Sequence, residues 1–303
     1  MSTIYDEILR TVGFAPHQIK PHGLTRFPTS SRPSNRDGWV RVMQDGIVRF
    51  GCWRQGVTGW WRDGVGNHQS IKRDEYADKL ALAEQEKKNQ RHGRINAQIF
   101  DCAHPLHRQS PVGQYLVHRG LSALKNWPQA LRMAVLPYFE DGVEQGQYPV
   151  MLGAVTTSEG VPVGLHRTYI SSSGKKAPVS SPKKLSRTSG LLAGASIKLF
   201  EPTTINGKLT LGVAEGIETA LACYLASGIL TWSCVSASGI KSFQWLEGLQ
   251  SLVIFGDNDA SGTGQAAARD LAGRAAAAGL ECRVLIPETV GNDWLDDYVG
   301  GDA

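Results

Sequence analysis

The last ~95 residues constrain the fold most, because short apolar runs alternate there with helical patterns at regular intervals. We expect buried strands at Leu209–Ala214, Thr231–Ser236, Ser251–Phe255 and Cys282–Ile286. Helical patterns lie between them, at Ile217–Ala226, Ile240–Leu246 and Gly264–Ala278. Parallel strands need long return connections, and helices of this length supply them. Residues 209–303 are therefore predicted to form an α/β domain, with flanking helices around a parallel sheet.

Acidic side chains follow two of these strands. Glu215 comes directly after the first strand, and Asp257 and Asp259 follow the third, two residues apart. Ligands of open parallel sheets bind beyond the carboxyl ends of the strands, so we expect the three carboxylates to converge. Such a cluster repels itself unless cations neutralise it, and hard oxygen ligands favour Mg²⁺ or Mn²⁺. A helix-entry glutamate and an Asp-rich turn are the structural alternative.

A glycine-rich segment follows the aspartate pair. Ser261, Gly262 and Gly264 stand where the third helix is predicted to begin. Free backbone N–H groups at a helix start can help to receive a phosphate group. Glycine-rich helix starts are also common without any ligand, so both interpretations stay open.

Charge is divided unevenly along the chain. Residues 1–94 hold 16 Lys and Arg against 10 Asp and Glu, and residues 95–208 hold 12 against 6. Residues 209–303 reverse the balance, with 4 against 12. A basic body joined to an acidic end suits a protein that grips a polyanion and holds metal ions at one place. Uneven surface charge without function is the alternative.

The predicted basic partner surface lies before the acidic end. Its members are expected to hold a triphosphate or a template backbone, and they are His166, Arg167, Lys175, Lys176, Lys183 and Lys184. The lysines fall in a stretch rich in Ser, Lys, Pro and Gly, 171–189, that is predicted to be a loop. A solvated lysine-rich loop is the alternative for them, whereas His166 and Arg167 lie on a predicted strand, Val161–Ile170.

The N-terminal part reads as a small β domain, residues 1–70, because strand-like pieces at 39–44, 46–53 and 58–61 alternate with turn residues. Tryptophans and arginines interleave in it, a composition that suits stacking on single-stranded bases. Trp60 and Trp61 are the predicted contacts, and a role in a small core is the alternative. Cys52 is the one cysteine of this segment, so no zinc is expected there.

Between the two ends, residues 71–94 are predicted to form a charged helical linker and residues 95–208 a basic α+β subdomain. A helix is expected near Val112–Arg119 and strands at Tyr148–Thr156 and Val161–Ile170. No stretch approaches the ~18 apolar residues that a membrane span needs, and no leader pattern opens the chain. We therefore expect a cytoplasmic protein without a membrane partner.

Three motifs together resemble a known family. VAEGIETALA at 213–222, LVIFGDNDASGTG at 252–264 and GNDWLDD at 291–297 are similar to the Toprim signature of primases, topoisomerases and some nucleases. EGIETAL, with HRTYI at 166–170 upstream, resembles the primase-like Toprim proteins of phages, plasmids and integrative elements. The resemblance covers about residues 100–303 and implies a Toprim-type fold for the acidic end.

The resemblance also implies roles. Glu215 would be the general acid/base or a metal-linked carboxylate, and Asp257 and Asp259 would be metal ligands. The family's acidic motif after the fourth strand matches Asp293 and Asp296, which would join the metal site. Bacterial primases also carry an Asp shortly after the first Glu, and this chain has Glu218 one position earlier.

The resemblance favours a DNA primase, a metal-dependent nucleotidyltransferase that makes primers on single-stranded DNA from ribonucleoside triphosphates with Mg²⁺ or Mn²⁺. A Toprim nuclease and a non-catalytic nucleic-acid-binding regulator are the alternatives. Primases often open with a zinc ribbon, from which this chain departs. No G-x-x-x-x-G-K-[ST] motif occurs, so a replicative helicase that takes part would be a separate chain.

Overall fold

The computed structural model describes residues 3–30, 36–43, 46–62 and 75–301, with the backbone alone given for 75–81. The chain divides into two compact units, Met1–Glu86 and Lys87–Ala303. The long helix α2 (Glu75–Asp101) contains this division and extends seven residues beyond the predicted end of the linker at 94. The predicted boundary at 70/71 lies outside the described residues. The predicted division into 1–70, 71–94, 95–208 and 209–303 stays a prediction.

The N-terminal unit is a four-stranded antiparallel sheet packed against one helix. Its elements are α1 (Ile4–Val12), β1 (Leu24–Phe27), β2 (Gly38–Val42), β3 (Val48–Cys52) and β4 (Val57–Trp61). The strands pair in chain order, and the buried face of the sheet packs against Ile8 and Val12 of α1. The predicted β domain is confirmed, whereas α1 and β1 were not predicted.

The first part of the second unit is built on another antiparallel sheet, whose five strands also pair in chain order. The strands are β5 (His104–Pro105), β6 (Leu131–Glu140), β7 (Val143–Thr156), β8 (Pro162–Tyr169) and β9 (Lys183–Leu185). One helix of this part, α3 (Pro111–His118), begins at the capping residue Ser110. The predicted loop 171–189 is wrong at β9, because Lys183–Leu185 pair with β8.

The second part is a mixed sheet with a parallel centre. Its strands are β10 (Thr203–Ile205), β11 (Lys208–Ala214), β12 (Thr231–Ser233), β13 (Ser251–Phe255) and β14 (Glu281–Leu285). β11 pairs in parallel with β12 and β13, β13 pairs in parallel with β14, and β10 adds an antiparallel edge. The predicted parallel sheet is confirmed, and β13 has the predicted bounds.

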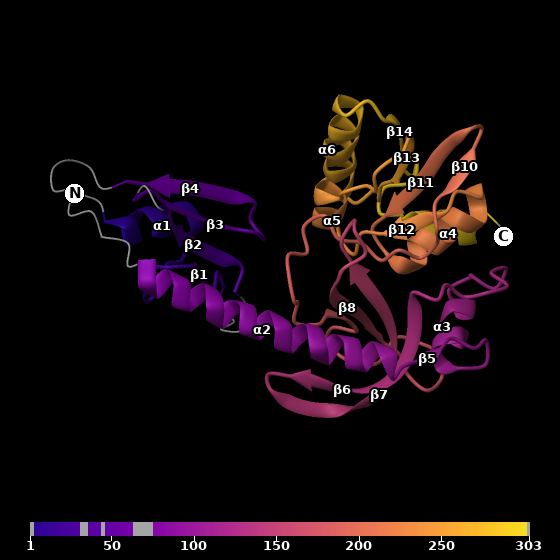
Figure 1. Cartoon of the computed structure of the whole chain (residues 1–303), viewed down its shortest axis with the longest axis horizontal. Coiled ribbons are helices and arrows are strands. Elements are labelled where there is room, and N and C mark those ends of the chain that lie inside the picture. Colours follow the sequence, from indigo (N-terminus) through magenta and orange to yellow (C-terminus); the bar gives the residue numbers. More distant parts are fainter. Residues whose placement is uncertain (1–2, 31–35, 44–45, 63–74, 302–303) are drawn as a thin grey trace. The chain divides into compact units, whose positions relative to one another are not determined.

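Helices cover both faces of this sheet (Figure 1). They are α4 (Ile217–Ser227), α5 (Ala237–Ser242), α6 (Thr263–Ala277) and α7 (Trp294–Gly300). Val253 and Phe255 of β13 face the core that holds α4 and α7, whereas Leu252 and Ile254 face the core that holds α5 and α6. The central strands β11 and β13 are buried on both sides along most of their length, and their apolar residues made them visible in the sequence. The edge strands β10 and β14 are more exposed and more polar.

The two sheets of the second unit share one core. A Cβ at Gly153 of β7 would lie 2.8 Å from Ile197 Cδ1 and 3.2 Å from Ile217 Cδ1, so glycine allows α4 to approach the antiparallel sheet closely. Tyr115 of α3 and Leu295 of α7 belong to the same buried cluster. The candidate site described next is therefore built from both sheets. Within the described part of the chain, no helix has the length and apolarity needed to cross a membrane.

Candidate active site

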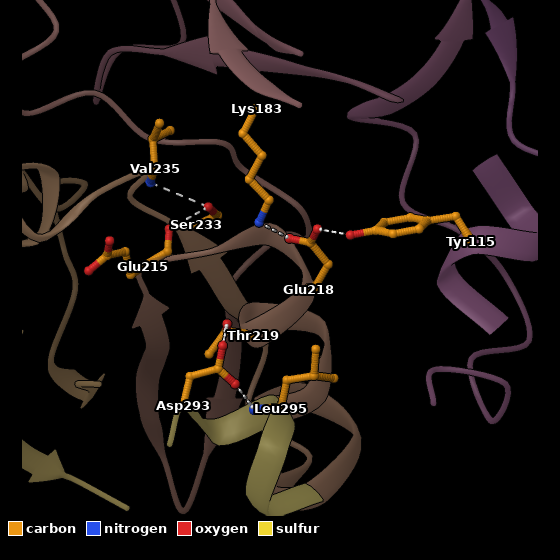
Figure 2. Close-up of polar contacts among 9 residues, drawn as sticks. All are labelled: Tyr115, Lys183, Glu215, Glu218, Thr219, Ser233, Val235, Asp293 and Leu295. Carbon is orange, nitrogen blue, oxygen red and sulfur yellow. Dashed lines mark hydrogen bonds and ion pairs between the residues drawn. The ribbon is translucent and has the colours of Figure 1, made fainter. Parts of the chain in front are cut away.

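Two acidic residues stand at the carboxyl ends of adjacent parallel strands. Ala214 is the Cα partner of Phe255, so β11 and β13 end at the same level. Glu215 follows β11 directly, and Asp257 comes two residues after β13. The Ser233 hydroxyl of β12 donates to the backbone carbonyl of Glu215 at 2.9 Å and so fixes the strand end (Figure 2). The topology therefore brings Glu215 and Asp257 to one edge of the sheet, as the sequence predicted.

The electrostatics of this edge are those of a self-repelling cluster. Burial raises the pKa of Asp257 to about 7, with Glu215 and then Asp293 adding repulsion. Burial also raises the pKa of Glu215, against the opposing effect of the Ala237 backbone N–H. The Oδ1 atom of Asp257 is buried and accepts no hydrogen bond from the described residues. A buried carboxylate oxygen without a donor is costly, so Asp257 is suited to an added cation.

Asp259 is held differently. Its Oδ2 accepts from the Gly264 backbone N–H at 2.7 Å, and its Oδ1 accepts from the Ser261 hydroxyl and the Thr263 backbone N–H. The Ser261 hydrogen bond is the main cause that lowers the pKa of Asp259. The carboxylate thus closes the start of α6, which is the structural alternative for this residue. The N–H groups of Thr263 and Gly264, expected to receive a phosphate, are engaged by Asp259 in this arrangement.

Asp293 and Asp296 form the capping box of α7. Asp293 Oδ1 accepts from the backbone N–H groups of Leu295 and Asp296, and Asp296 accepts in return from that of Asp293. Asp293 Oδ2 accepts from the Thr219 hydroxyl of α4 at 3.2 Å (Figure 2). Both carboxylates nevertheless raise the pKa of Asp257 through space. Their role as metal ligands stays a prediction, and capping is what the contacts support.

The predicted basic residues separate onto two faces of the antiparallel sheet. His166 and Lys183 lie on the face toward α4, and His166 is buried with its Nδ1 unpartnered among the described residues. Burial lowers the pKa of His166 to about 4, so the ring is neutral at pH 7. Arg167 and Lys184 lie on the other face, where the Lys184 ammonium donates to the Phe139 carbonyl. The structure therefore does not bring these four side chains together.

Lys175 and Lys176 lie in the exposed turn between β8 and β9. The Lys175 carbonyl and backbone N–H bond to Ser171, and Lys176 forms an isolated bridge with Ile170. Their side chains are exposed, as expected for a solvated lysine-rich loop.

A buried carboxylate connects Lys183 to α3 (Figure 2). Glu218 Oε2 lies 3.0 Å from the Lys183 ammonium, and Glu218 Oε1 accepts from the Tyr115 hydroxyl at 2.7 Å. Although burial opposes it, the Lys183 charge and the Tyr115 hydrogen bond hold the pKa of Glu218 at about 2. Tyr115 was not predicted, because it lies 103 residues from Glu218 and no spacing rule joins them.

Two family models match parts of this chain. The model of the Toprim domain family matches residues 210–301. Residues 210–301 are a Toprim domain. A second model, described as a domain of unknown function (DUF7146), matches residues 90–198. The search of the curated proteins finds no match. The Toprim domain thus holds Glu215, Asp257 and Glu218, whereas Tyr115 and Lys183 come from the segment of unknown function.

Several solved structures are similar to this chain. A DNA primase domain from Pseudomonas aeruginosa is 15% identical, with a TM-score of 0.36, and the match covers 54% of this chain and 50% of that one. A DnaG primase catalytic domain bound to single-stranded DNA is 14% identical, with a TM-score of 0.44 and coverage of 73% and 79%. The primase fragment of the bacteriophage T7 primase-helicase protein is 13% identical, with a TM-score of 0.38 and coverage of 91% and 94%. The chain thus spans half the length of the first of these.

Toprim domains are generally dependent on divalent metal ions. Among the described residues, no three His, Cys, Asp or Glu side chains are arranged to hold a metal ion. Glu215 and Asp257, called the Toprim carboxylates below, nevertheless fit a divalent cation. Asp257 has a buried oxygen without a partner, and the pKa values of both carboxylates are raised. Glu215 and Asp257 are the residues that would hold the ion.

Next to the Toprim carboxylates, Val235 has a φ of 70°. A β-branched residue in this region is strained, and such strain tends to occur at functional sites. Its backbone N–H donates to Ser233 Oγ, the same hydroxyl that bonds the Glu215 carbonyl (Figure 2). The strained turn is therefore connected to Glu215 through Ser233.

The N-terminal sheet, described by itself, exposes an aromatic and basic face. Arg41, Arg49 and Trp60 are cross-strand neighbours on β2, β3 and β4, and all three are exposed. Trp60 is 69% exposed, whereas Trp61 points to the other face and packs on the small core. The structure thus separates the two predicted contacts, with Trp60 exposed on one face and Trp61 partly buried against the core on the other.

A second row on the same face extends this surface. Arg26 and Trp39 are cross-strand neighbours on β1 and β2. The Trp39 ring stacks on that of Trp53 at a centroid distance of 5.9 Å, and the Arg26 guanidinium lies 4.9 Å from the Trp53 centroid. Rings and guanidinium groups therefore occupy the exposed face in two adjacent rows.

Proposed function

We propose that this protein is a metal-dependent nucleotidyltransferase of the DNA primase type, which makes primers on single-stranded DNA from ribonucleoside triphosphates. The observation that carries the proposal is the Asp257 carboxylate, which has a buried unpartnered oxygen and a pKa of about 7 beside Glu215 in a Toprim domain. A site of this kind is suited to bind a divalent cation together with a phosphate group. It has no evident use in packing.

Glu215 and Asp257 would bind Mg²⁺ or Mn²⁺, and the bound ion would neutralise charge on the transferring phosphate. Burial raises the pKa of Glu215, so the alternative role that we propose for it is to accept a proton from the attacking hydroxyl. Asp259 would hold the start of α6 in place and would join the ligand set only after giving up its hydrogen bonds. Asp293 and Asp296 would act on the site mainly through their negative charge.

The basic residues would contribute unequally to substrate binding. Lys183 is directed toward the Toprim domain and is the proposed phosphate contact. His166 lies on the same face of the sheet but is buried and neutral, so we propose that it packs in the core next to Lys183 rather than binding phosphate. Arg167 and Lys184 on the other face, and Lys175 and Lys176 in the exposed turn, would contact the nucleic-acid backbone at most peripherally.

The exposed face of the N-terminal sheet is the proposed single-strand contact. Trp60 would stack on a base while Arg41 and Arg49, in the same cross-strand row, would contact phosphates. This function needs no zinc, and metal analysis of the purified protein should find no stoichiometric zinc. A replicative helicase is a further proposed partner.

The proposal is tested by incubating the full chain with single-stranded DNA, labelled ribonucleotides and Mg²⁺ or Mn²⁺. New oligonucleotides that disappear in Glu215→Gln and Asp257→Asn are the expected result. The exposed Glu281, at the opposite end of the sheet, provides the matched control Glu281→Gln, which should keep full activity. Degradation of the template would show a Toprim nuclease instead, and DNA binding without chemistry would show a regulator.

A further inference from the structure

Both carboxylate oxygens of the buried Glu218 have partners within the protein. Its side chain is 4% exposed, its Oε1 accepts from Tyr115, and its Oε2 pairs with Lys183. A carboxylate so deeply buried is stable only when it is paired and hydrogen-bonded, because its hydration is lost. These partners account for the charge of Glu218 fully. The residue therefore serves to hold its neighbours rather than to coordinate an ion.

The neighbour that matters is Lys183. Its side chain is 40% exposed although its ammonium is anchored to a buried group. A free lysine side chain samples many rotamers, whereas an ion pair to a fixed carboxylate confines it. The Tyr115 hydroxyl fixes that carboxylate in turn, from a helix of the segment of unknown function (Figure 2). Two directional contacts thus determine where the ammonium lies.

Lys183 also lies near Glu215. The Glu218 side chain that pairs with it stands in the first turn of α4, three residues after Glu215. An ammonium has three N–H donors, of which Glu218 engages one. The remaining donors belong to a partly exposed ammonium next to the helix that begins two residues after Glu215. This is where a phosphate would approach in a nucleotidyl transfer.

We propose that Tyr115 and Glu218 are positioning residues that hold the Lys183 ammonium beside Glu215, where it binds a phosphate oxygen of the substrate. The inference rests on the proposed function for the identity of the substrate. The phosphate belongs either to the nucleoside triphosphate or to the DNA backbone, which share the same chemistry. It also gives the segment of unknown function a definite task, the delivery of one anchored cation to the Toprim domain.

The test is a thermodynamic cycle on the full chain, with equilibrium binding of single-stranded DNA and of ATP with Mg²⁺ as two separate measurements. Lys183→Ala should weaken one of the two affinities roughly tenfold, as expected for a charge-assisted contact. Glu218→Gln and Tyr115→Phe should each weaken the same affinity about threefold or more. In the Lys183→Ala background, neither Glu218→Gln nor Tyr115→Phe should weaken binding further, because no lysine side chain is left for them to position.

The two binding measurements, with ATP and with single-stranded DNA, identify the source of the phosphate. A loss confined to ATP assigns it to the nucleotide, and a loss confined to DNA assigns it to the template; either supports the proposal. Additive effects of Glu218→Gln and Lys183→Ala would overturn it, since they would mean that Glu218 acts independently of Lys183. Unchanged affinities in Lys183→Ala would overturn it as well. The measurements need no turnover, so failure of primer synthesis alone would refute the proposed function and leave this inference standing.

Thermal unfolding controls for the fold. Lys183→Ala leaves a buried carboxylate without its cation and should lower the melting temperature, whereas the double variant Lys183→Ala/Glu218→Gln should regain part of it. Tyr115→Phe removes a single hydroxyl and remains informative where Lys183→Ala does not fold. Matched controls come from the exposed Lys208–Glu281 pair at the other end of the sheet. Lys208→Ala and Glu281→Gln should leave both affinities unchanged.

Discussion

The replacement of Asp257 by asparagine should stabilise the protein while it removes activity. The rise of the Asp257 pKa from 3.8 to about 7 means that the folded state disfavours the ionised form. At about 1.4 kcal/mol for each pH unit, this corresponds to about 4 kcal/mol. Asp257 is only partly buried, so solvent screens some of the repulsion, and we expect about half of this amount. The neutral Asp257→Asn variant should therefore gain about 2 kcal/mol at pH 8.

The sign of the effect depends on pH. Below pH ~4 the carboxyl is protonated in both the folded and the unfolded chain, so the variant and the wild type should be equally stable. Between the unfolded pKa of 3.8 and the folded pKa of about 7, the unfolded chain releases its proton first. The wild type therefore loses stability as the pH rises through this range, and Asp257→Asn should become more stable than the wild type over the same range.

Thermal unfolding in EDTA and in Mg²⁺ measures the effect. A gain of about 2 kcal/mol is expected to raise the melting temperature by roughly 4–8 °C, given the size of the unit that holds the site. Mg²⁺ should stabilise the wild type more than the variant and so reduce the difference between their melting temperatures. The exposed Asp270, paired with Lys241, gives the control Asp270→Asn, which should show no gain. Equal or lower stability of Asp257→Asn at pH 8 in EDTA would refute the reasoning.

Three further predictions concern other parts of the chain. His166→Asn should flatten the pH dependence of stability between pH 6.5 and 4, because burial lowers the His166 pKa to about 4 and the unfolded chain takes up its proton first. Denaturant unfolding should show that the wild type loses about 3 kcal/mol of stability as the pH falls through this range. An unchanged pH dependence of stability in the variant would contradict the prediction. Trp60→Ala should cost roughly 1–3 kcal/mol of affinity for single-stranded DNA at nearly unchanged stability, whereas Trp61→Ala should mainly lower stability. Fluorescence anisotropy measures the affinity and thermal unfolding measures the stability. The reverse pattern would assign Trp60 to the core. Arg49→Ala should reduce the slope of log affinity against log salt concentration by about 1, and an identical slope would exclude a phosphate contact.

The central strands of the parallel sheet could be predicted most sharply from the sequence, because they are buried on both faces. The predicted bounds of β13, Ser251–Phe255, agree with the observed bounds, because all five residues are buried. The positions of Glu215 and Asp257 followed from the ends of such strands, since parallel neighbours end at one edge. The proximity of these two carboxylates could therefore be predicted from the sequence alone.

Other elements give weaker sequence signals. β6 (Leu131–Glu140) lacks a regular alternation of buried and exposed residues and contains Pro137, which argues against a strand. β9 is polar, and only its pairing with β8 makes Lys183–Leu185 extended. In contrast, α1 carried a visible signal, because Thr3 and Asp6 form a capping box and Gly13 ends the helix.

The contacts of the acidic residues could not be derived from spacing either. Asp259, Asp293 and Asp296 have residue types that suit a metal site and a helix cap equally well, and only their hydrogen bonds distinguish the two. The link from Tyr115 to Glu218 joins residues that are far apart in the chain, so it depends on the packing of α3 against α4.

The ion pair between Lys183 and Glu218 crosses the gap between the two family matches, which end at 198 and begin at 210. Recombination within that gap would give a chimera whose buried glutamate faces a foreign surface without its cation or its tyrosine. The close approach of Gly153 to Ile217 would change at the same junction, because the two residues lie in different family matches. The two segments should thus be exchanged between proteins as one block, and grafting experiments should keep residues 90–301 together.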